Sequence, residues 1–397
     1  MKIKGFKTFA ALLAALFGIT ASDVLGQSGQ QYLISDQTEI QQAKANPTPN
    51  ATVGTQDDAA TDAAVADATA DSGNVLELGG WLQGGYHSYN TGMFNNRDSE
   101  FNLHQAYFYA EKAANADNGL GLGFRMDYVY GIDAQDTQAF FGPASSWDNT
   151  WDNGAYGHAL PQLYAEMAWG DLNVKVGKFY TIMGYETVTA PDNFFYSHAF
   201  TMFNSEPFTH TGVLGEFDMG DVTLFGGYTM GWDSGFDTSI GDGSNFLGGG
   251  SLAFGDGATI THTMTVGRLG AGSTQDGYSH SFVADMHLTD GLNFVIQSDY
   301  VDNPNINESY GVNTYLTLDL NEQVSIGTRM EWWNTHVTGA RTGSSDLYAI
   351  THGVNIKLAD NLIIRPEARW NKDDDGILIN GNHNNRYGFG MDMIMTY

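Results

Sequence analysis

The sequence contains no cysteine, so it can form neither a disulfide nor a thiolate metal site. Basic residues are also scarce: 17 Lys and Arg stand against 46 Asp and Glu, which gives a formal net charge of −29. Nucleic acid is therefore not expected as a partner, because phosphate binding requires a basic surface. Aromatic residues reach 13% and glycine occupies 49 of 397 positions. This composition favours an all-β protein with many short strands and polar loops over a helical one.

The apolar run at the N-terminus, Thr8 to Ala21, is too short to cross a bilayer comfortably as a helix. It follows Lys2, Lys4 and Lys7, an order that predicts a signal peptide over residues 1–26 and secretion by the Sec route. An N-terminal membrane anchor is the alternative. Residues 27–73 are rich in Ala, Asp and Thr with almost no large apolar side chains. Such a segment cannot bury enough surface to fold, so it is predicted to be a disordered acidic tether.

From residue 74 to 397 the sequence alternates between apolar and polar positions in stretches of strand length. The stretch DNLIIRPEARW, for example, places Leu362, Ile364 and Trp370 on the face opposite Arg365 and Arg369. A side-chain period of two indicates β-strands with one apolar face. About sixteen such segments occur, each close to the length that a tilted membrane strand needs. They predict a transmembrane antiparallel β-barrel of about 16 strands.

The connections between these segments alternate in length, seven short and eight longer. Short turns at one end and long loops at the other are typical of bacterial outer-membrane barrels, with the short turns and both termini in the periplasm. Aromatic residues at the segment ends share the parity of the apolar positions, which predicts girdles at the two membrane interfaces. The predicted girdle residues are Tyr130, Trp169, Trp232, Tyr300, Tyr310, Trp332, Tyr348, Trp370 and Tyr387.

The last stretch, RYGFGMDMIMTY, alternates regularly and ends on Tyr397. Outer-membrane barrels are similar in ending on an aromatic residue that serves as a signal to the barrel-assembly machinery. Tyr397 is therefore expected to be part of that signal, and the last strand to close the barrel against the first, near LELGGWLQGGYHSY. Closure removes the unpaired strand edge that lipid does not tolerate.

One region carries a resemblance to a known family. The stretches GKFYTIMGYE (177–186), PDNFFYSH (191–198) and PFTHTGV (207–213), together with LHQAYFYAEK (103–112), resemble the putative β-barrel porin-2 (OmpL-like) family. The resemblance covers roughly residues 75–397. It implies an outer-membrane porin-like protein, and it supplies no catalytic residue, cofactor or substrate.

A sixteen-strand barrel is wide enough for an aqueous channel, and its selectivity depends on what narrows it. The third long loop, 181–208, is the candidate constriction, since this loop folds inward in general porins. It carries Glu186, Asp192 and Glu206 and no Lys or Arg. Strand parity directs the other candidate constriction residues into the lumen: Arg125, Asp127, Arg329, Glu331, Arg365, Glu367 and Arg369. An acidic loop opposite a basic wall would produce a field across the pore. In the alternative arrangement the loop caps the barrel from outside.

These features predict a weakly cation-selective outer-membrane channel for passive diffusion of small hydrophilic solutes or ions, with lipid around it and a homotrimer as one assembly. The acidic loops could bind divalent cations, although NKDDDG (371–376) matches a calcium loop only in part. A non-transport barrel, serving as an adhesin or structural anchor, is the main alternative. An outer-membrane hydrolase is a further one, but neither GxSxG nor HExxH occurs in the sequence. No enzyme activity, cofactor or resident metal is therefore expected.

Overall fold

The computed structural model describes residues 75–117, 119–139, 147–148, 152–237, 245–255, 257–269, 275–304, 306–337, 343–374 and 385–397. The predicted signal peptide and the predicted tether lie outside these residues, as does part of the NKDDDG stretch. Among the described residues, no helix combines the length and the hydropathy needed to cross a membrane.

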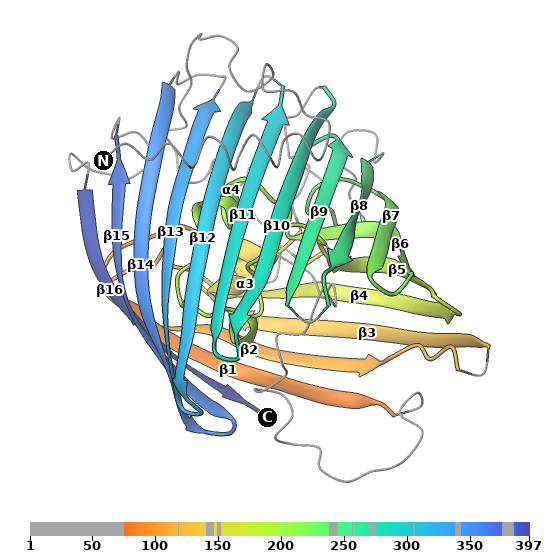
Figure 1. Cartoon of the computed structure of the whole chain (residues 1–397), viewed down its shortest axis with the longest axis horizontal. Helices are drawn as coiled ribbons and strands as arrows, with labels where there is room; N and C mark the ends of the chain where they lie inside the picture. Colours follow the sequence, from red (N-terminus) through yellow and green to blue (C-terminus); the bar gives the residue numbers. More distant parts are fainter. Residues whose placement is uncertain are drawn as a thin grey trace.

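Sixteen antiparallel strands form one closed barrel, which confirms the predicted fold (Figure 1). The strands are β1 Glu77–His87, β2 Phe101–Lys112, β3 Leu120–Gly131, β4 Gly157–Trp169, β5 Leu172–Tyr180, β6 Thr209–Asp218, β7 Val222–Thr229, β8 Asn245–Ala253, β9 Ala258–Gly267, β10 Gly277–Thr289, β11 Leu292–Asn303, β12 Asn307–Asn321, β13 Val324–Val337, β14 Gly343–Ala359, β15 Leu362–Asp373 and β16 Asn385–Thr396. Within the described residues, three short helical segments lie in the connections: α3 Asp133–Thr137, η2 Ala190–Asp192 and α4 Phe200–Asn204.

Strand β16 closes the barrel against β1, with Trp81 opposite Thr396 and His87 opposite Gly390. Tyr397 extends this seam, because its backbone exchanges hydrogen bonds of 3.0 and 3.2 Å with Gly80. The connections after even-numbered strands are short, and most of those after odd-numbered strands are long, as the sequence predicts. The connection between β11 and β12 is an exception in length, since β11 ends at Asn303 and β12 already begins at Asn307.

Each strand has one outward and one inward face. In β16, Tyr387, Phe389 and Met391 are exposed on the outside, whereas Asp392 and Ile394 are buried on the inside. The barrel wall is uneven in height: β5 to β9 contain only 8–10 residues each, whereas β12 to β14 contain 14–17. A shorter strand covers less of the apolar thickness of a bilayer.

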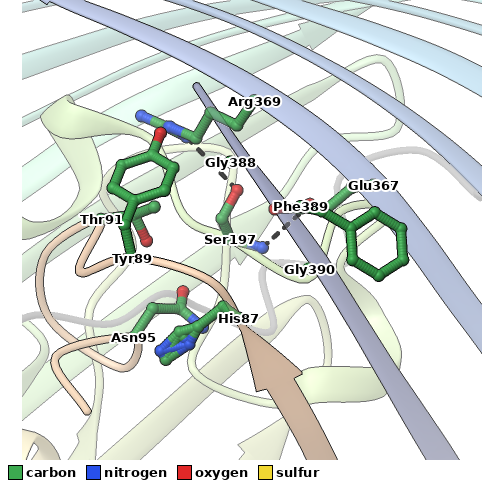
Figure 2. A pocket seen from close by; sticks show the side chains of 10 residues that line it. All are labelled: His87, Tyr89, Thr91, Asn95, Ser197, Glu367, Arg369, Gly388, Phe389 and Gly390. Atoms are coloured by element: carbon green, nitrogen blue, oxygen red, sulfur yellow. Dashed lines mark hydrogen bonds between the residues drawn. The ribbon is translucent and has the colours of Figure 1, made fainter. Parts of the chain in front are cut away.

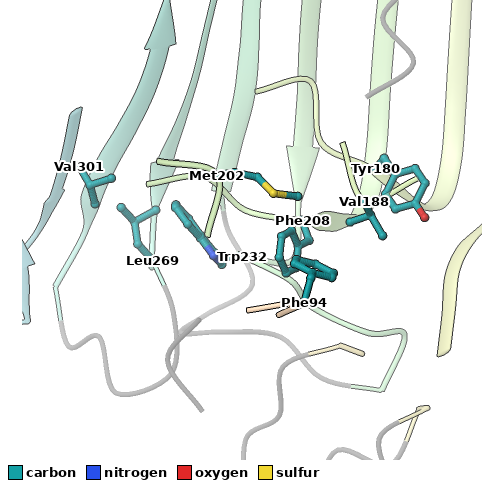
Figure 3. Packing of buried hydrophobic residues seen from close by; sticks show 8 residues of the cluster. All are labelled: Phe94, Tyr180, Val188, Met202, Phe208, Trp232, Leu269 and Val301. Carbon is teal, nitrogen blue, oxygen red and sulfur yellow. The ribbon is translucent and has the colours of Figure 1, made fainter. Parts of the chain in front are cut away.

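One predicted girdle residue lies elsewhere. Trp232 is buried, and it packs with Phe94, Met202 and Phe208 inside the barrel (Figure 3). Strand β7 has already ended at Thr229, and positive φ angles at Gly231 and Asp233 turn the chain inward. The strand parity used for the prediction no longer applies beyond that point. The prediction that Trp232 belongs to the girdle is therefore wrong.

The principal apolar clusters of the fold lie inside the barrel. The cluster in Figure 3 joins residues of the barrel wall and of the connections 88–100, 181–208, 230–244 and 268–276: Phe94, Tyr180, Val188, Met202, Phe208, Trp232, Leu269 and Val301. Helix α4 packs on β12 and β13, and α3 packs on β2, β3 and β4. Both helices appear within the ring of strands in Figure 1. The lumen is thus occupied by folded connections, which determine what could pass through it.

Candidate functional site

The connection 181–208, here called the inner loop, folds into the barrel instead of capping it. Phe194 and Phe195 lie over the lumenal wall, where a Cβ atom on Gly327 would come within 2.4 Å of the Phe194 ring. On α4, Thr201 approaches Gly311 of β12 so closely that a Cβ atom there would lie 2.2 Å from its methyl group. Glycine at these two wall positions provides the space in which the inner loop lies.

Three arginines of the wall hold the inner loop by its backbone carbonyl groups. Arg329 of β13 donates to Ser197 O at 2.5 Å, and Arg369 of β15 donates to His198 O at 3.1 Å. Arg365 of β15 donates to the carbonyl oxygens of Ala190 and Asn193 on either side of η2. All three guanidinium groups are buried, with at most 3% of each residue exposed. A planar guanidinium suits this role because it offers several donors in a fixed geometry.

Two glutamates of the same wall hold the inner loop by its N–H groups. Glu331 accepts a hydrogen bond of 2.8 Å from Phe200 N, at the first residue of α4. Glu367 accepts bonds of 3.1 Å from Tyr196 N and Ser197 N. The wall charges also neutralise one another, since Arg329 and Arg369 both contact Glu331, at 2.7 and 3.0 Å. The wall therefore binds both carbonyl and N–H groups of the inner loop backbone, and Glu331 remains paired with arginines.

The inner loop contributes one carboxylate to this network. Glu186 accepts from Arg329 Nη1 at 2.6 Å, from Ala199 N at 2.8 Å and from Tyr315 Oη at 3.1 Å, and it lies 3.1 Å from the His198 ring. Burial alone would raise the pKa of Glu186, but Arg329 and the hydrogen bonds outweigh it and lower the pKa to about 2. Glu186 is thus an ionised partner of the wall, in direct contact with the arginine that the sequence placed opposite it.

The second glutamate of the inner loop has the opposite electrostatic environment. Glu206 is buried at the end of the loop, where Gln297 Nε2 donates to its Oε1. The same amide nitrogen donates to Asp299 Oδ2 at 2.7 Å, so the two carboxyl groups lie side by side. Burial and the nearby Asp299 raise the pKa of Glu206 well above its ordinary value.

Asp192 is the exposed member of the three loop carboxylates, since Glu186 and Glu206 are buried. It ends η2, whose flanking carbonyl groups are held by Arg365. Arg365 itself is paired with Asp392 of β16 at 2.6 Å. Asp192 is therefore exposed on the inner loop, while the other two carboxyl groups of the loop are buried against the wall.

A second charged group lines the wall at β2 and β3. Arg125 of β3 donates to Asp127 at 2.8 Å and to Glu111 at 2.6 Å, and its guanidinium lies over the Tyr109 ring. Asp127 also accepts a 2.5 Å hydrogen bond from Tyr107. Arg125 and Glu111 are partly exposed, in contrast to the arginines under the inner loop. The charges predicted from strand parity are thus directed inward, but they are paired at each wall instead of facing one another across open space.

A small cavity of about 10 Å³ lies beside the inner loop and the β1–β16 seam, and its volume would accommodate about one water molecule (Figure 2). Ser197, Glu367 and Arg369 line one side of it, and His87 and Asn95 the other. Both ring nitrogens of His87 are buried without a hydrogen-bond partner in the protein. The cavity therefore has a polar lining that suits water or another small polar group.

Several residues that hold the inner loop were not identified from the sequence, among them Ser197, Gln297, Asp299 and Asp392. In β11, Gln297 and Asp299 alternate with Ile296 and Ser298. This alternation in the sequence could have identified Gln297 and Asp299 as lumen-facing residues. No pattern in the neighbouring sequence predicts their contact with Glu206, which lies 91 positions before Gln297. The structure shows no group of three or more His, Asp or Glu suited to a metal ion among its described residues.

A family model described as "Putative beta-barrel porin-2, OmpL-like" matches residues 75–397. A search of curated proteins found no match. Among solved structures, OmpF of Salmonella typhi in complex with daunomycin matches at 13% identity, covering 82% of this chain and 98% of that one, with a TM-score of 0.56.

Two further structures share the fold. An anion-selective porin of Comamonas acidovorans matches at 11% identity, covering 81% of this chain and 99% of that one, with a TM-score of 0.54. The trimer form of OmpT, an outer membrane protein of Vibrio cholerae, matches at 10% identity, covering 81% and 99%, with a TM-score of 0.51. The chain belongs to the putative β-barrel porin-2 (OmpL-like) family and is a bacterial outer-membrane β-barrel.

Proposed function

We propose that the protein is a porin-like channel for passive diffusion of small hydrophilic solutes or ions, in which the inner loop forms the constriction. The observation that carries this proposal is the attachment of the inner loop to β13 and β15 by buried, mutually paired charges. These contacts fix the inner loop across the lumen, and a loop held there by buried charges narrows the passage and sets its lining.

Weak cation selectivity is part of the proposal. Asp192 is exposed on the inner loop, and the chain as a whole carries a formal net charge of −29. A lumen and mouth lined by negative charge concentrate cations. The fold alone does not determine this property, since one structural relative is described as anion-selective. No enzyme activity is proposed, because the lumenal carboxylates Glu186, Glu331 and Glu367 serve as structural partners of arginines or backbone N–H groups.

A homotrimer is the proposed assembly. One relative is described in a trimer form. In this chain, β5 to β9 form the shortest part of the wall, and a short wall can avoid mismatch with lipid by contacting another protomer. Outward-facing glycines lie side by side there, with Gly215 opposite Gly226 and Gly226 opposite Gly248. Their low profile permits close approach of a second copy.

The test is single-channel conductance in a planar bilayer for the full protein and for a variant lacking residues 187–200. We expect discrete openings in the wild type and a larger conductance in the variant, because the inner loop no longer narrows the lumen. Removal of the exposed pair by Arg97→Ala is the control and should change neither value. Equal conductance with and without residues 187–200 would show that the inner loop does not form the constriction.

A second candidate function, a non-transport barrel such as an adhesin or anchor, is favoured by one observation. Lumen-facing side chains toward the long-loop end are almost fully buried, including those of Ser309, Thr335 and Ser345. An occupied lumen suits a barrel that displays loops and passes no solute. The two functions differ in the same bilayer experiment, because the non-transport barrel gives no openings in the wild type.

A further inference from the structure

The end of the inner loop meets β10, β11 and β12 at a polar cluster distinct from the arginine contacts. Its centre is Gln297, whose Oε1 accepts a hydrogen bond of 3.2 Å from Tyr185 N. This bond fixes the orientation of the amide, so Nε2 faces Glu206 and Asp299 and donates to both. The two carboxyl groups are buried, with 1% and 2% of each residue exposed.

The cluster has an unbalanced charge. Among the ion pairs of the described residues, none joins Glu206 or Asp299 to a Lys, Arg or His side chain. Arg329 contacts Glu186 and Glu331 instead. Two adjacent buried carboxylates repel strongly at low dielectric, and one shared amide does not compensate two charges. Either a bound proton or a bound cation would balance the excess charge.

Two oxygen atoms of the cluster, Glu206 Oε2 and Asn313 Oδ1, have no hydrogen-bond partner in the protein, and the hydroxyl groups of Ser281 and Thr201 lie beside the Asp299 carboxyl group. Ser281 is directly opposite Asp299 in the β10–β11 pair, and Asn313 is directly opposite Gln297 in the β11–β12 pair. Ser281, Asp299 and Asn313 lie on the lumenal face of the wall, Glu206 lies on the inner loop, and each of the four is at most 2% exposed. The amide nitrogen of Asn313 donates to Thr201 on α4, so its oxygen remains as an acceptor.

We propose that Glu206, Asp299, Ser281 and Asn313 form a binding site for a hard cation, with Ca²⁺ as the preferred ion. Two carboxylates with neutral hydroxyl and amide oxygens are the ligand types that Ca²⁺ selects, and Ca²⁺ accepts the irregular geometry that strand pairing imposes. Mg²⁺ requires a near-ideal octahedron and is expected to bind less tightly. The site is independent of whether the barrel conducts, because it depends only on how the inner loop is attached.

A cation here would join the end of the inner loop to β10, β11 and β12. The arginine contacts attach the preceding part of the loop to β13 and β15. Together the two attachments would hold both the middle and the end of the loop against the wall. Removal of the ion would release the end while the arginine contacts persist.

The experiment uses the full protein in detergent after treatment with EDTA. The temperature at which the folded band converts to the unfolded band on a gel is measured with Ca²⁺, with Mg²⁺ and without either ion. Binding of Tb³⁺ is followed by luminescence excited through nearby aromatic rings, since Trp333 donates to Ser205 beside the site. We expect Ca²⁺ to raise the conversion temperature more than Mg²⁺ does, and to displace Tb³⁺.

The E206Q/D299N variant should lose both the Ca²⁺ effect and the Tb³⁺ signal. The matched control is E322Q/D360N, which removes two exposed carboxylates from tight turns and should keep both. Should E206Q/D299N fail to fold, S281A removes one neutral ligand without changing charge and should weaken Ca²⁺ binding several-fold. Equal stabilisation of E206Q/D299N and the wild type by Ca²⁺ would overturn the proposal. Stabilisation of the wild type by acid with no effect of Ca²⁺ would also overturn it, because protons would then balance the two carboxylates.

Discussion

Arg329 of β13 donates a 2.6 Å hydrogen bond to Glu186, a residue 143 positions earlier in the chain and inside the barrel. Arg329 also contacts Glu331 at 2.7 Å and Ser197 O at 2.5 Å. One fully buried side chain thus connects the wall, its own strand and two points of the inner loop. The position of the inner loop should be especially sensitive to this arginine.

Replacing Arg329 by Met should release the inner loop. Removing one partner of a buried ion pair typically costs about 3–5 kcal/mol, because the other charge remains buried without compensation. The expected result is faster proteolysis within residues 181–208 and noisier or larger single-channel conductance. The R329M/E186L double variant should be less affected than R329M, since it removes both charges. If the effect of the double variant on proteolysis equals the sum of the effects of R329M and E186L, the two residues are not directly coupled.

Acid should weaken the attachment of the inner loop through Glu186. The pKa of Glu186 is lowered from 4.5 to about 2 in the folded protein, so its contribution is fully present above about pH 4.5 and is lost as the pH falls toward 2. The shift corresponds to about 3 kcal/mol. Conductance recorded between pH 5 and pH 2 should show a transition in the wild type. E186Q should lack this transition, and identical profiles for the two proteins would refute the assignment.

Gly311 should tolerate no side chain. A Cβ atom on Gly311 would lie 2.2 Å from the Thr201 methyl group, so Gly311→Val should displace α4 from the wall. The expected result is a folded barrel, judged by its gel mobility, with the inner loop open to protease. Combining it with Thr201→Gly should restore part of the protection. Gly226→Ala is the control, because nothing lies within 4 Å of a Cβ atom at that outward position.

Strand parity predicted the barrel, its alternating connections and the inward direction of Arg329, Arg365 and Arg369, because alternation is a local property of the chain. It could not predict that these arginines would be buried under the inner loop, since that depends on contacts such as Arg365 with Asn193, 172 positions apart. The direction of Trp232 could not be predicted from alternation either, because positive φ angles on both sides of it follow the end of the strand. Glu186 and Glu206 look alike in the sequence, and their different wall partners give them opposite pKa shifts.

A large side chain at Gly226 should prevent trimer formation while leaving the barrel intact. Gly226→Phe places a ring on the outside of β7, the shortest strand. The proposed contact between protomers needs a surface there without large side chains. The expected result is a monomer in chemical cross-linking and native gels, with an unchanged conversion temperature of the monomer. Ala368→Phe is the matched control on the outer face of β15 and should leave the assembly unchanged. A trimer that persists in Gly226→Phe would place the contact on another part of the wall.

Cation preference should depend on Asp192 more than on the other two carboxylates of the inner loop. Asp192 is exposed, whereas the charge of Glu186 is compensated by Arg329 and the raised pKa of Glu206 disfavours its ionised form. Asp192→Asn should therefore move the reversal potential under a salt gradient toward zero. The shift should persist at high ionic strength, because charges within a narrow lumen are screened less than those at its rim. Asp374→Asn, at an exposed position after β15, should have an effect only at low salt. A reversal potential that follows Asp374 and not Asp192 would place the selectivity at the mouth of the barrel, outside the inner loop.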